Sequence, residues 1–261
     1  MIWCRFQSGN TVSYGIVESQ TVMAVDGSPF GEHSVTAVRY PLDAVKLLVP
    51  VVPGTFYAAG ANYAGHIAGM VKSGLVNSDF WPAKPDIGYR ANNALIAHGE
   101  NIVKPGDAGE EFQYEAELVA VIGKKVKNVS KEEALDCVLG WTIGNDVTER
   151  SWVRNDRVGW RSKNSDTFKP MGRWIVTGLD PMDMTTTIRI NGKVLESFAT
   201  GNMIFDLATY ISAMTRYVTL HPGDVIWLGT DGEPQNMKPG DTIEIEITGI
   251  GVLRNPIVAE A

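Results

Sequence analysis

The stretch Tyr114-Glu115-Ala116-Glu117-Leu118-Val119-Ala120-Val121-Ile122 carries more information about fold and chemistry than any other part of this chain. Its apolar and β-branched residues predict a strand, in which side chains alternate between two faces. Glu115 and Glu117 therefore point the same way, roughly 6.6 Å apart at their Cα atoms. Two carboxylates this close need water or a cation. Because Val119 and Val121 are typical of a core, a hard divalent ion is one interpretation, and a solvated edge strand is the other.

The composition is that of a soluble globular protein, with 44% hydrophobic and 20% charged residues among 261. The formal net charge of -7 argues against nucleic acid or an anionic membrane as a partner, since both require a basic surface. The densest basic stretch, residues 150–163, is interrupted by Asp156 and fits better a pocket for a small acidic molecule. We find neither a secretory pattern nor a membrane-length apolar run, and Cys4 and Cys137 have no paired spacing. We therefore expect a cytoplasmic protein with reduced thiols.

The chain divides into two expected parts of mixed β structure with few helices. Residues 1–50 predict a small N-terminal β domain, because 11–17 and 21–25 alternate between apolar and polar residues. The prolines near residue 50 mark the boundary to a main body, 51–261. Its expected strands are 56–59, 94–98, 115–123, 140–144, 174–177, 186–190, 224–228 and 242–247. The expected helices are 61–72, 131–138 and 204–215, with 42–48 as a short helical or extended link.

A metal held by the two glutamates requires a third oxygen ligand, for which Asp146 is the best candidate. It follows the apolar strand 140–144, where strand ends commonly face a cleft. A capping role at a turn is the alternative for this aspartate. Three carboxylates leave open positions on a magnesium-like ion, which prefers six oxygen ligands.

Several segments in collinear order resemble the fumarylacetoacetate hydrolase family. They are Asn62 to His66, Tyr114 to Leu118, Asn145 to Arg150, Lys163 to Gly172, Leu220 to Ile226, Lys238 to Asp241 and Gly249 to Pro256. The resemblance covers roughly residues 55 to 258, and it is the ordered set that makes it specific.

This resemblance implies a β-sandwich or roll, usually in a homodimer, with a catalytic domain over residues 51–261. It also implies Mg²⁺ or Mn²⁺ bound by Glu115, Glu117 and Asp146. Members act on 2-oxo and 2,4-dioxo acids as acylpyruvate-type hydrolases, decarboxylases, and isomerases or tautomerases. Family membership thus sets the substrate class, a small anionic oxo acid, and leaves the reaction open.

The same resemblance assigns roles to single residues. Lys163 is the expected electrophilic partner, because fixed positive charge stabilises a developing enolate or alkoxide. His66 is the expected acid and base, on a short helix after a glycine turn. The expected substrate contacts are Tyr63, Arg90, Arg150 and Thr230.

Some positions depart from the family's pattern. Gly69 stands where hydrolytic members commonly carry a glutamate that orients the histidine, and this favours decarboxylation or tautomerisation over hydrolysis. Glu110 or Glu111 is a candidate to supply that carboxylate from another loop. Arg90 occupies a position where relatives often have lysine, and residues 231–234 differ from the usual apolar loop, so we expect a distinct substrate. The third hypothesis is a non-catalytic β protein with a structural metal.

Overall fold

The computed structural model describes residues 1–261 and contains two main β-sheets. The larger sheet has thirteen strands, ten of them in the order β4-β3-β2-β1-β15-β12-β11-β18-β6-β7, with β5 on β1, β14 on β12 and β8 on β14. Their bounds are β1 (Ile2–Ser8), β2 (Thr11–Glu18), β3 (Thr21–Gly27), β4 (His33–Pro41), β5 (Lys46–Leu47), β6 (Phe56–Ala59), β7 (Ile87–Tyr89), β8 (Leu95–Ala97), β11 (Ala116–Ile122), β12 (Val138–Asn145), β14 (Lys169–Met171), β15 (Ile175–Val176) and β18 (Val225–Trp227).

The second sheet has five strands in the order β17-β16-β19-β20-β9. They are β9 (Ile102–Lys104), β16 (Thr185–Ile190), β17 (Lys193–Ala199), β19 (Thr242–Ile247) and β20 (Gly251–Ala259), and a separate pair is formed by β10 (Phe112–Gln113) and β13 (Thr148–Glu149). The helices are α1 (Ala64–Lys72), α2 (Arg150–Val153) and α3 (Leu207–Thr215), with short 3₁₀ turns η1 (Leu42–Ala44), η2 (Asn92–Ala94), η3 (Ala134–Cys137) and η4 (Pro181–Asp183). The predicted mixed β fold with few helices is confirmed.

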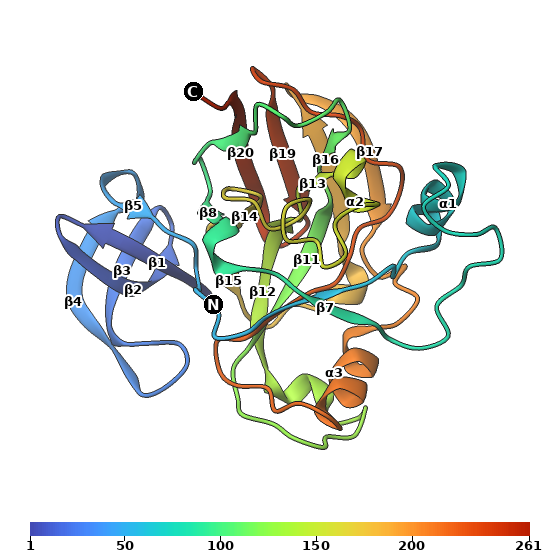
Figure 1. The fold of residues 1–261 in the computed structure, drawn as a ribbon. Helices are drawn as coiled ribbons and strands as arrows, with labels where there is room; N and C mark the ends of the chain where they lie inside the picture. The colour runs from blue at the N-terminus through green and yellow to red at the C-terminus, as the bar shows by residue number, and fades with distance from the viewer.

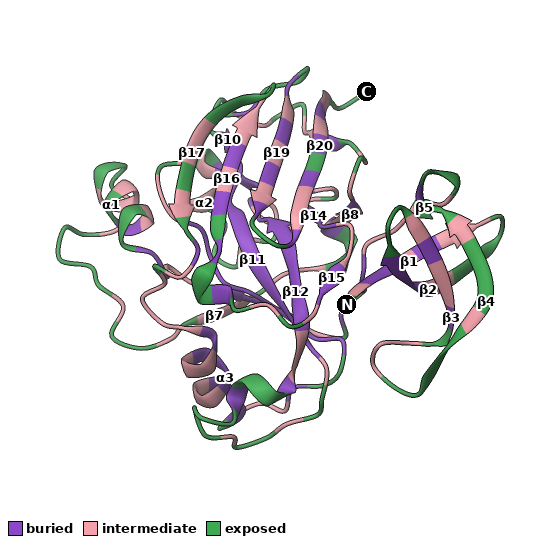
Figure 2. Ribbon diagram, turned by 180° about the vertical axis from the view of Figure 1, so that it is seen from behind, coloured by how far each residue is buried: buried purple, intermediate pink, exposed green.

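Strand β11 lies at the centre of the molecule and is buried on both faces (Figure 2). Leu118 and Ala120 point into the main core, which also contains Ile245 of the second sheet. Val119 and Val121 point the opposite way, into a smaller core. Glu115 and Glu117 share the face of these valines, because side chains two residues apart along an extended chain lie on one face.

The N-terminal segment lies to one side of the molecule (Figure 1). Its strands β1 to β4 form an antiparallel meander around a small core that includes Cys4, Phe6 and Val22. This meander is continuous with the large sheet, because β1 pairs with β15 through Ile2 and Trp3. The segment therefore adds its strands to the edge of the main sheet.

Some predicted elements differ from the observed ones. The helix predicted over 131–138 is the short turn η3, because β12 already begins at Val138. Just before this turn, the amide of Glu133 donates to Ser130 Oγ at 3.3 Å. The helices predicted over 61–72 and 204–215 begin three residues later than expected. No helix has the length and apolar character needed to span a membrane.

Candidate metal centre

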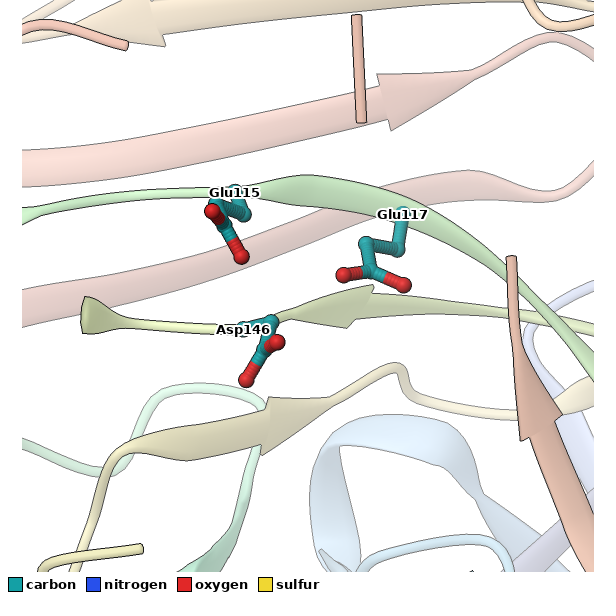
Figure 3. Close-up of side chains that lie close together, drawn as sticks. All are labelled: Glu115, Glu117 and Asp146. Carbon is teal, nitrogen blue, oxygen red and sulfur yellow. The ribbon is translucent and has the colours of Figure 1, made fainter. Parts of the chain in front are cut away.

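The antiparallel register of β11 and β12 brings the three predicted ligands together. Glu117 lies opposite Gly144, and Ala116 lies opposite Asn145. The next step of this register places Asp146, just after β12, across from Glu115, just before β11. Figure 3 shows the glutamates side by side along one strand and Asp146 at the end of its neighbour.

The three carboxylates are buried, and one oxygen from each lies within 4.8 Å of the others. The backbone around them is fixed by hydrogen bonds. The amide of Glu115 donates to Asn145 Oδ1 at 3.1 Å, and the amide of Gly229 donates to Glu117 Oε2 at 2.7 Å. The three carboxylate oxygens are therefore close enough together to bind a single ion.

Basic side chains surround two of the three acids. Lys163 Nζ donates to Glu115 Oε2 at 2.5 Å and to Asp146 Oδ2 at 2.8 Å. Arg150 forms an ion pair with Glu115 through Nη2. Burial by itself raises the pKa of Glu115, but Arg150 and Lys163 outweigh it and hold that pKa below its usual range.

Glu117 differs from the other two acids because no basic side chain forms an ion pair with it. Burial, together with the nearby charges of Asp146 and Glu115, raises the pKa of Glu117 to about 8. An uncompensated carboxylate beside two others is the environment that a divalent cation neutralises. The donor set, three hard oxygens, therefore fits Mg²⁺ or Mn²⁺.

Asp146 forms ion pairs with more basic side chains than the sequence indicated. Lys169, which is completely buried, lies 2.7 Å from Asp146 Oδ1. Its ammonium also donates to the carbonyls of Val147 at 3.0 Å and Phe168 at 2.9 Å, so all three of its N–H donors have acceptors. Lys169 is not among the site residues predicted from the sequence. The available signal was a charged residue inside the apolar strand that follows Phe168.

Arg90 lies against a predicted metal ligand, although we expected it to bind substrate. Its Nη2 donates to Asp146 Oδ2 at 2.7 Å and its Nε to Asp146 Oδ1 at 3.1 Å. Arg90 does line the cavity above the acids. Its guanidinium is nevertheless engaged by the aspartate in this structure.

Tyr63 is placed differently from the prediction. Its side chain is completely buried, and its hydroxyl donates to the carbonyl of Thr200 at 2.8 Å. Tyr63 also does not line the cavity that contains the acids. The structure therefore gives this tyrosine a packing role at the start of α1.

The acids line a cavity of about 230 Å³, called the inner cavity here. It shares the lining residues His66, Met70, Leu75 and Arg150 with a neighbouring cavity of about 440 Å³, called the outer cavity. Lys163 and Thr230 line the inner cavity, and Glu111 lines the outer one. His66 and Arg150 line both. His66 Nε2 lies 3.7 Å from Glu115 Oε1, so the histidine stands between the outer cavity and the acids.

Comparisons with known proteins agree with this architecture. The family described as "Fumarylacetoacetate (FAA) hydrolase C-terminal" matches residues 55–258, and the family "Rv2993c-like, N-terminal" matches residues 1–50. "Protein Rv2993c" of Mycobacterium tuberculosis is 37% identical over 97% of both chains.

Two solved structures cover the whole of this chain and are covered by it completely. One is described as 5-carboxymethyl-2-hydroxymuconate delta-isomerase from Mycobacterium smegmatis, with 34% identity and a TM-score of 0.90. The other is a fumarylacetoacetate hydrolase from the psychrophilic Exiguobacterium antarcticum, with 31% identity and a TM-score of 0.85.

Proposed function

Because the chain belongs to the fumarylacetoacetate hydrolase family, we propose that it is a divalent-metal-dependent enzyme that hydrolyses a carbon–carbon bond of a 2,4-dioxo acid. The observation that carries this proposal is the position of His66. It lies between the outer cavity and the acids, 3.7 Å from Glu115. A base at this junction meets both entering water and the reacting part of a substrate in the inner cavity.

In this proposal Glu115, Glu117 and Asp146 hold Mg²⁺ or Mn²⁺. The ion, when bound, supplies Lewis acidity at the 2-oxo end of the substrate. Lys169 forms an ion pair with Asp146, and the amide of Gly229 donates to Glu117, so the orientation of these two carboxylates does not depend on the substrate.

Lys163 and Arg150 supply fixed positive charge in the inner cavity. Lys163 Nζ reaches between two acids, so its ammonium is fixed where negative charge develops during the reaction. Arg150 offers a planar guanidinium suited to a carboxylate. Thr230, three residues after β18, is buried, lines the inner cavity and offers a hydroxyl to the substrate.

The proposed reaction begins when His66 accepts a proton from water, whose oxygen then bonds to the 4-oxo carbon. The bond between carbons 3 and 4 breaks, and its electron pair stays on carbon 3. Carbon 3 takes up the proton that His66 had accepted. One water is consumed, and a carboxylic acid and pyruvate are released.

The second candidate is an isomerase, tautomerase or decarboxylase acting on a 2-oxo or 2-hydroxymuconate-type acid. His66 Nδ1 is buried and has no side-chain partner, so no carboxylate orients the imidazole through this nitrogen to activate water. Proton transfer that does not involve water requires a less precisely oriented base than hydrolysis does. A relative of 34% identity is also described as an isomerase.

The two candidates are separated by a panel of acylpyruvates, oxaloacetate and hydroxymuconate-type dienoates, assayed with Mg²⁺ or Mn²⁺ and analysed by mass. Pyruvate plus a second acid identifies hydrolysis. Carbon dioxide or an isomer of unchanged mass identifies the second candidate. Glu117→Gln should abolish either activity, whereas Glu246→Gln makes the same chemical change at a half-buried position of β19 outside both cavities and should leave it unchanged. Full turnover by Glu117→Gln, or no turnover of any compound by the parent protein, contradicts the proposal.

A further inference from the structure

The outer cavity is lined mainly by polar side chains, and several of them are charged. Its basic residues are Lys72, Arg150 and Arg154, and its acidic residues are Glu111 and Glu233. An alkyl or aromatic group placed among these charges would displace their water without replacing the lost hydrogen bonds, which is unfavourable. A ligand group that fills this cavity is therefore polar or charged.

Two of the three basic residues already have partners within the protein. Lys72 Nζ donates to both carboxylate oxygens of Glu233, at 3.1 and 2.9 Å. Arg150 forms an ion pair with Glu115, and its Nε donates to Gln113 Oε1 at 3.0 Å. An anionic ligand must compete with these acceptors for either residue.

Arg154 is the basic residue of the outer cavity that forms no ion pair. It follows α2, and its Nη2 donates to the carbonyls of Ser73 at 3.2 Å and Gly74 at 3.3 Å, just after α1. These bonds hold the guanidinium between the ends of the two helices and leave Nε and Nη1 without a partner. No carboxylate pairs with Arg154, although Glu111 lines the same cavity. Its positive charge is therefore available to an anion.

The position of Arg154 relative to the acids defines which part of a ligand it can meet. Arg154 lines the outer cavity and not the inner one. The two cavities share the aliphatic side chains of Met70 and Leu75. A ligand bound at the acids through an oxo-acid group, and extending past this aliphatic surface, has its far end in the outer cavity. An anionic group at each end of a short carbon chain fits this arrangement.

We propose that Arg154 is a specificity-determining residue that binds a second carboxylate at the far end of the substrate, which is therefore a dicarboxylic oxo acid. A singly charged carboxylate fits better than a phosphate dianion, because Glu111 and Glu233 repel additional negative charge. The inference rests on the proposed function for the reaction, whereas the binding preference requires no turnover.

The first test measures binding without turnover. The ligands 2-oxoheptanedioate and 2-oxoheptanoate have the same length, differ only at the terminal carbon, and lack the 4-oxo group that cleavage requires. Calorimetry with Mn²⁺ should give the parent protein a Kd about tenfold lower for the diacid, the effect of one hydrogen bond between charged groups. Arg154→Gln should make the two Kd values equal. Arg157→Gln, the same change at an exposed arginine outside both cavities, should keep the difference.

The two ligands are compared within each protein, so a loosening of α1 caused by loss of the Ser73 and Gly74 contacts affects both Kd values alike. A parent protein that does not prefer the diacid overturns the inference. A preference that survives in Arg154→Gln, or one that disappears in Arg157→Gln, also overturns it.

The second test uses turnover of the corresponding 2,4-dioxo acids. In the parent protein, kcat/KM should be about tenfold higher for 2,4-dioxoheptanedioate than for 2,4-dioxoheptanoate, and Arg154→Gln should remove this difference. Equal kcat/KM values in the parent protein overturn the role of Arg154 and leave the proposed function intact. Preferential binding of the diacid without turnover of either compound supports the role of Arg154 and contradicts the proposed hydrolysis.

Discussion

Asp146 lies directly across from Glu115, and its amide donates to the carbonyl of Glu115 at 2.9 Å. This hydrogen bond continues the ladder of β11 and β12 beyond its last registered pair, Ala116 with Asn145. Acids 31 positions apart in the sequence thus become neighbours through strand register alone. Because a one-residue slip would turn one set of acids to the opposite face, the site depends on whatever fixes this register.

Gly144 is one of the residues on which the register depends. It pairs with Glu117, and a Cβ there would lie 2.5 Å from Cζ3 of the fully buried Trp227. We expect Gly144→Ala to destabilise the protein by about 1–3 kcal/mol through overpacking and to weaken Mn²⁺ binding by displacing Asp146. Urea unfolding and Mn²⁺ titration measure the two effects. Gly31→Ala, where nothing lies within 4 Å of the added Cβ, is the control and should change neither.

Glu117 makes the metal-free protein less stable than it would otherwise be. Its raised folded-state pKa, about 8 against 4.5, means that the folded state holds its proton more tightly. Between pH 4.5 and 8, the stability of the metal-free protein should therefore be greatest at the low end and fall as pH rises. Glu117→Gln should remove this slope and stabilise the metal-free protein at pH 8 by about 1–3 kcal/mol.

The same variant distinguishes an effect on metal binding from an effect on folding. Mn²⁺ or Mg²⁺ should raise the Tm of the parent protein by mass action and leave that of Glu117→Gln unchanged. Thermal unfolding with and without the ion is the measurement. An equal rise in both proteins would argue against Glu117 as a ligand.

Lys169 should contribute much more to stability than a lysine in a surface ion pair. Lys169→Met leaves the buried carbonyl of Val147 without a donor and removes one counter-charge of Asp146, so we expect a loss of about 3–5 kcal/mol. Lys46→Met removes an exposed pair with Glu100 and should cost less than about 1 kcal/mol. Chemical unfolding of both variants tests the contrast, and similar losses would contradict it.

His98 should make the protein sensitive to mild acid. Its Nδ1 accepts from the amide of Arg254 at 3.1 Å, which requires an unprotonated nitrogen. Burial, with a further contribution from Arg173 and Arg254, lowers the pKa of His98 from 6.5 to about 4. The unfolded state therefore binds more protons between these values, and stability should fall as pH drops from 6.5 to 4.

His98→Asn tests this sensitivity, because an asparagine oxygen keeps the acceptor for Arg254 and does not titrate. Its stability profile should be flatter than that of the parent between pH 6.5 and 4. The exposed His33→Asn is the matched control and should keep the parent profile. A slope unchanged in His98→Asn would assign the acid sensitivity to other groups.

The sequence by itself determined the elements whose pattern is local. Strands 56–59 and 242–247 were predicted to the residue, because alternation and turn formers at their ends require no distant contact. The pairing of Glu115 with Glu117 on one face followed from the period of a strand, and Asp146 from its place after an apolar strand. Ordered motifs were sufficient to predict the family and therefore the fold.

Only the tertiary structure decided which charges meet. Lys169 and Arg90 reach Asp146 because strands and loops distant in sequence converge there. The Tyr63 hydroxyl is directed away from the inner cavity because it donates to the carbonyl of Thr200. The close approach of the loop 231–234 to helix α1 depends on Gly65 and Gly69, where an added Cβ would lie 2.5 Å from Asp231 Oδ1 and 3.3 Å from Glu233 Cγ. Sequence periodicity specifies the face on which a side chain lies, whereas its partners depend on sheet register and loop packing, which no local pattern encodes.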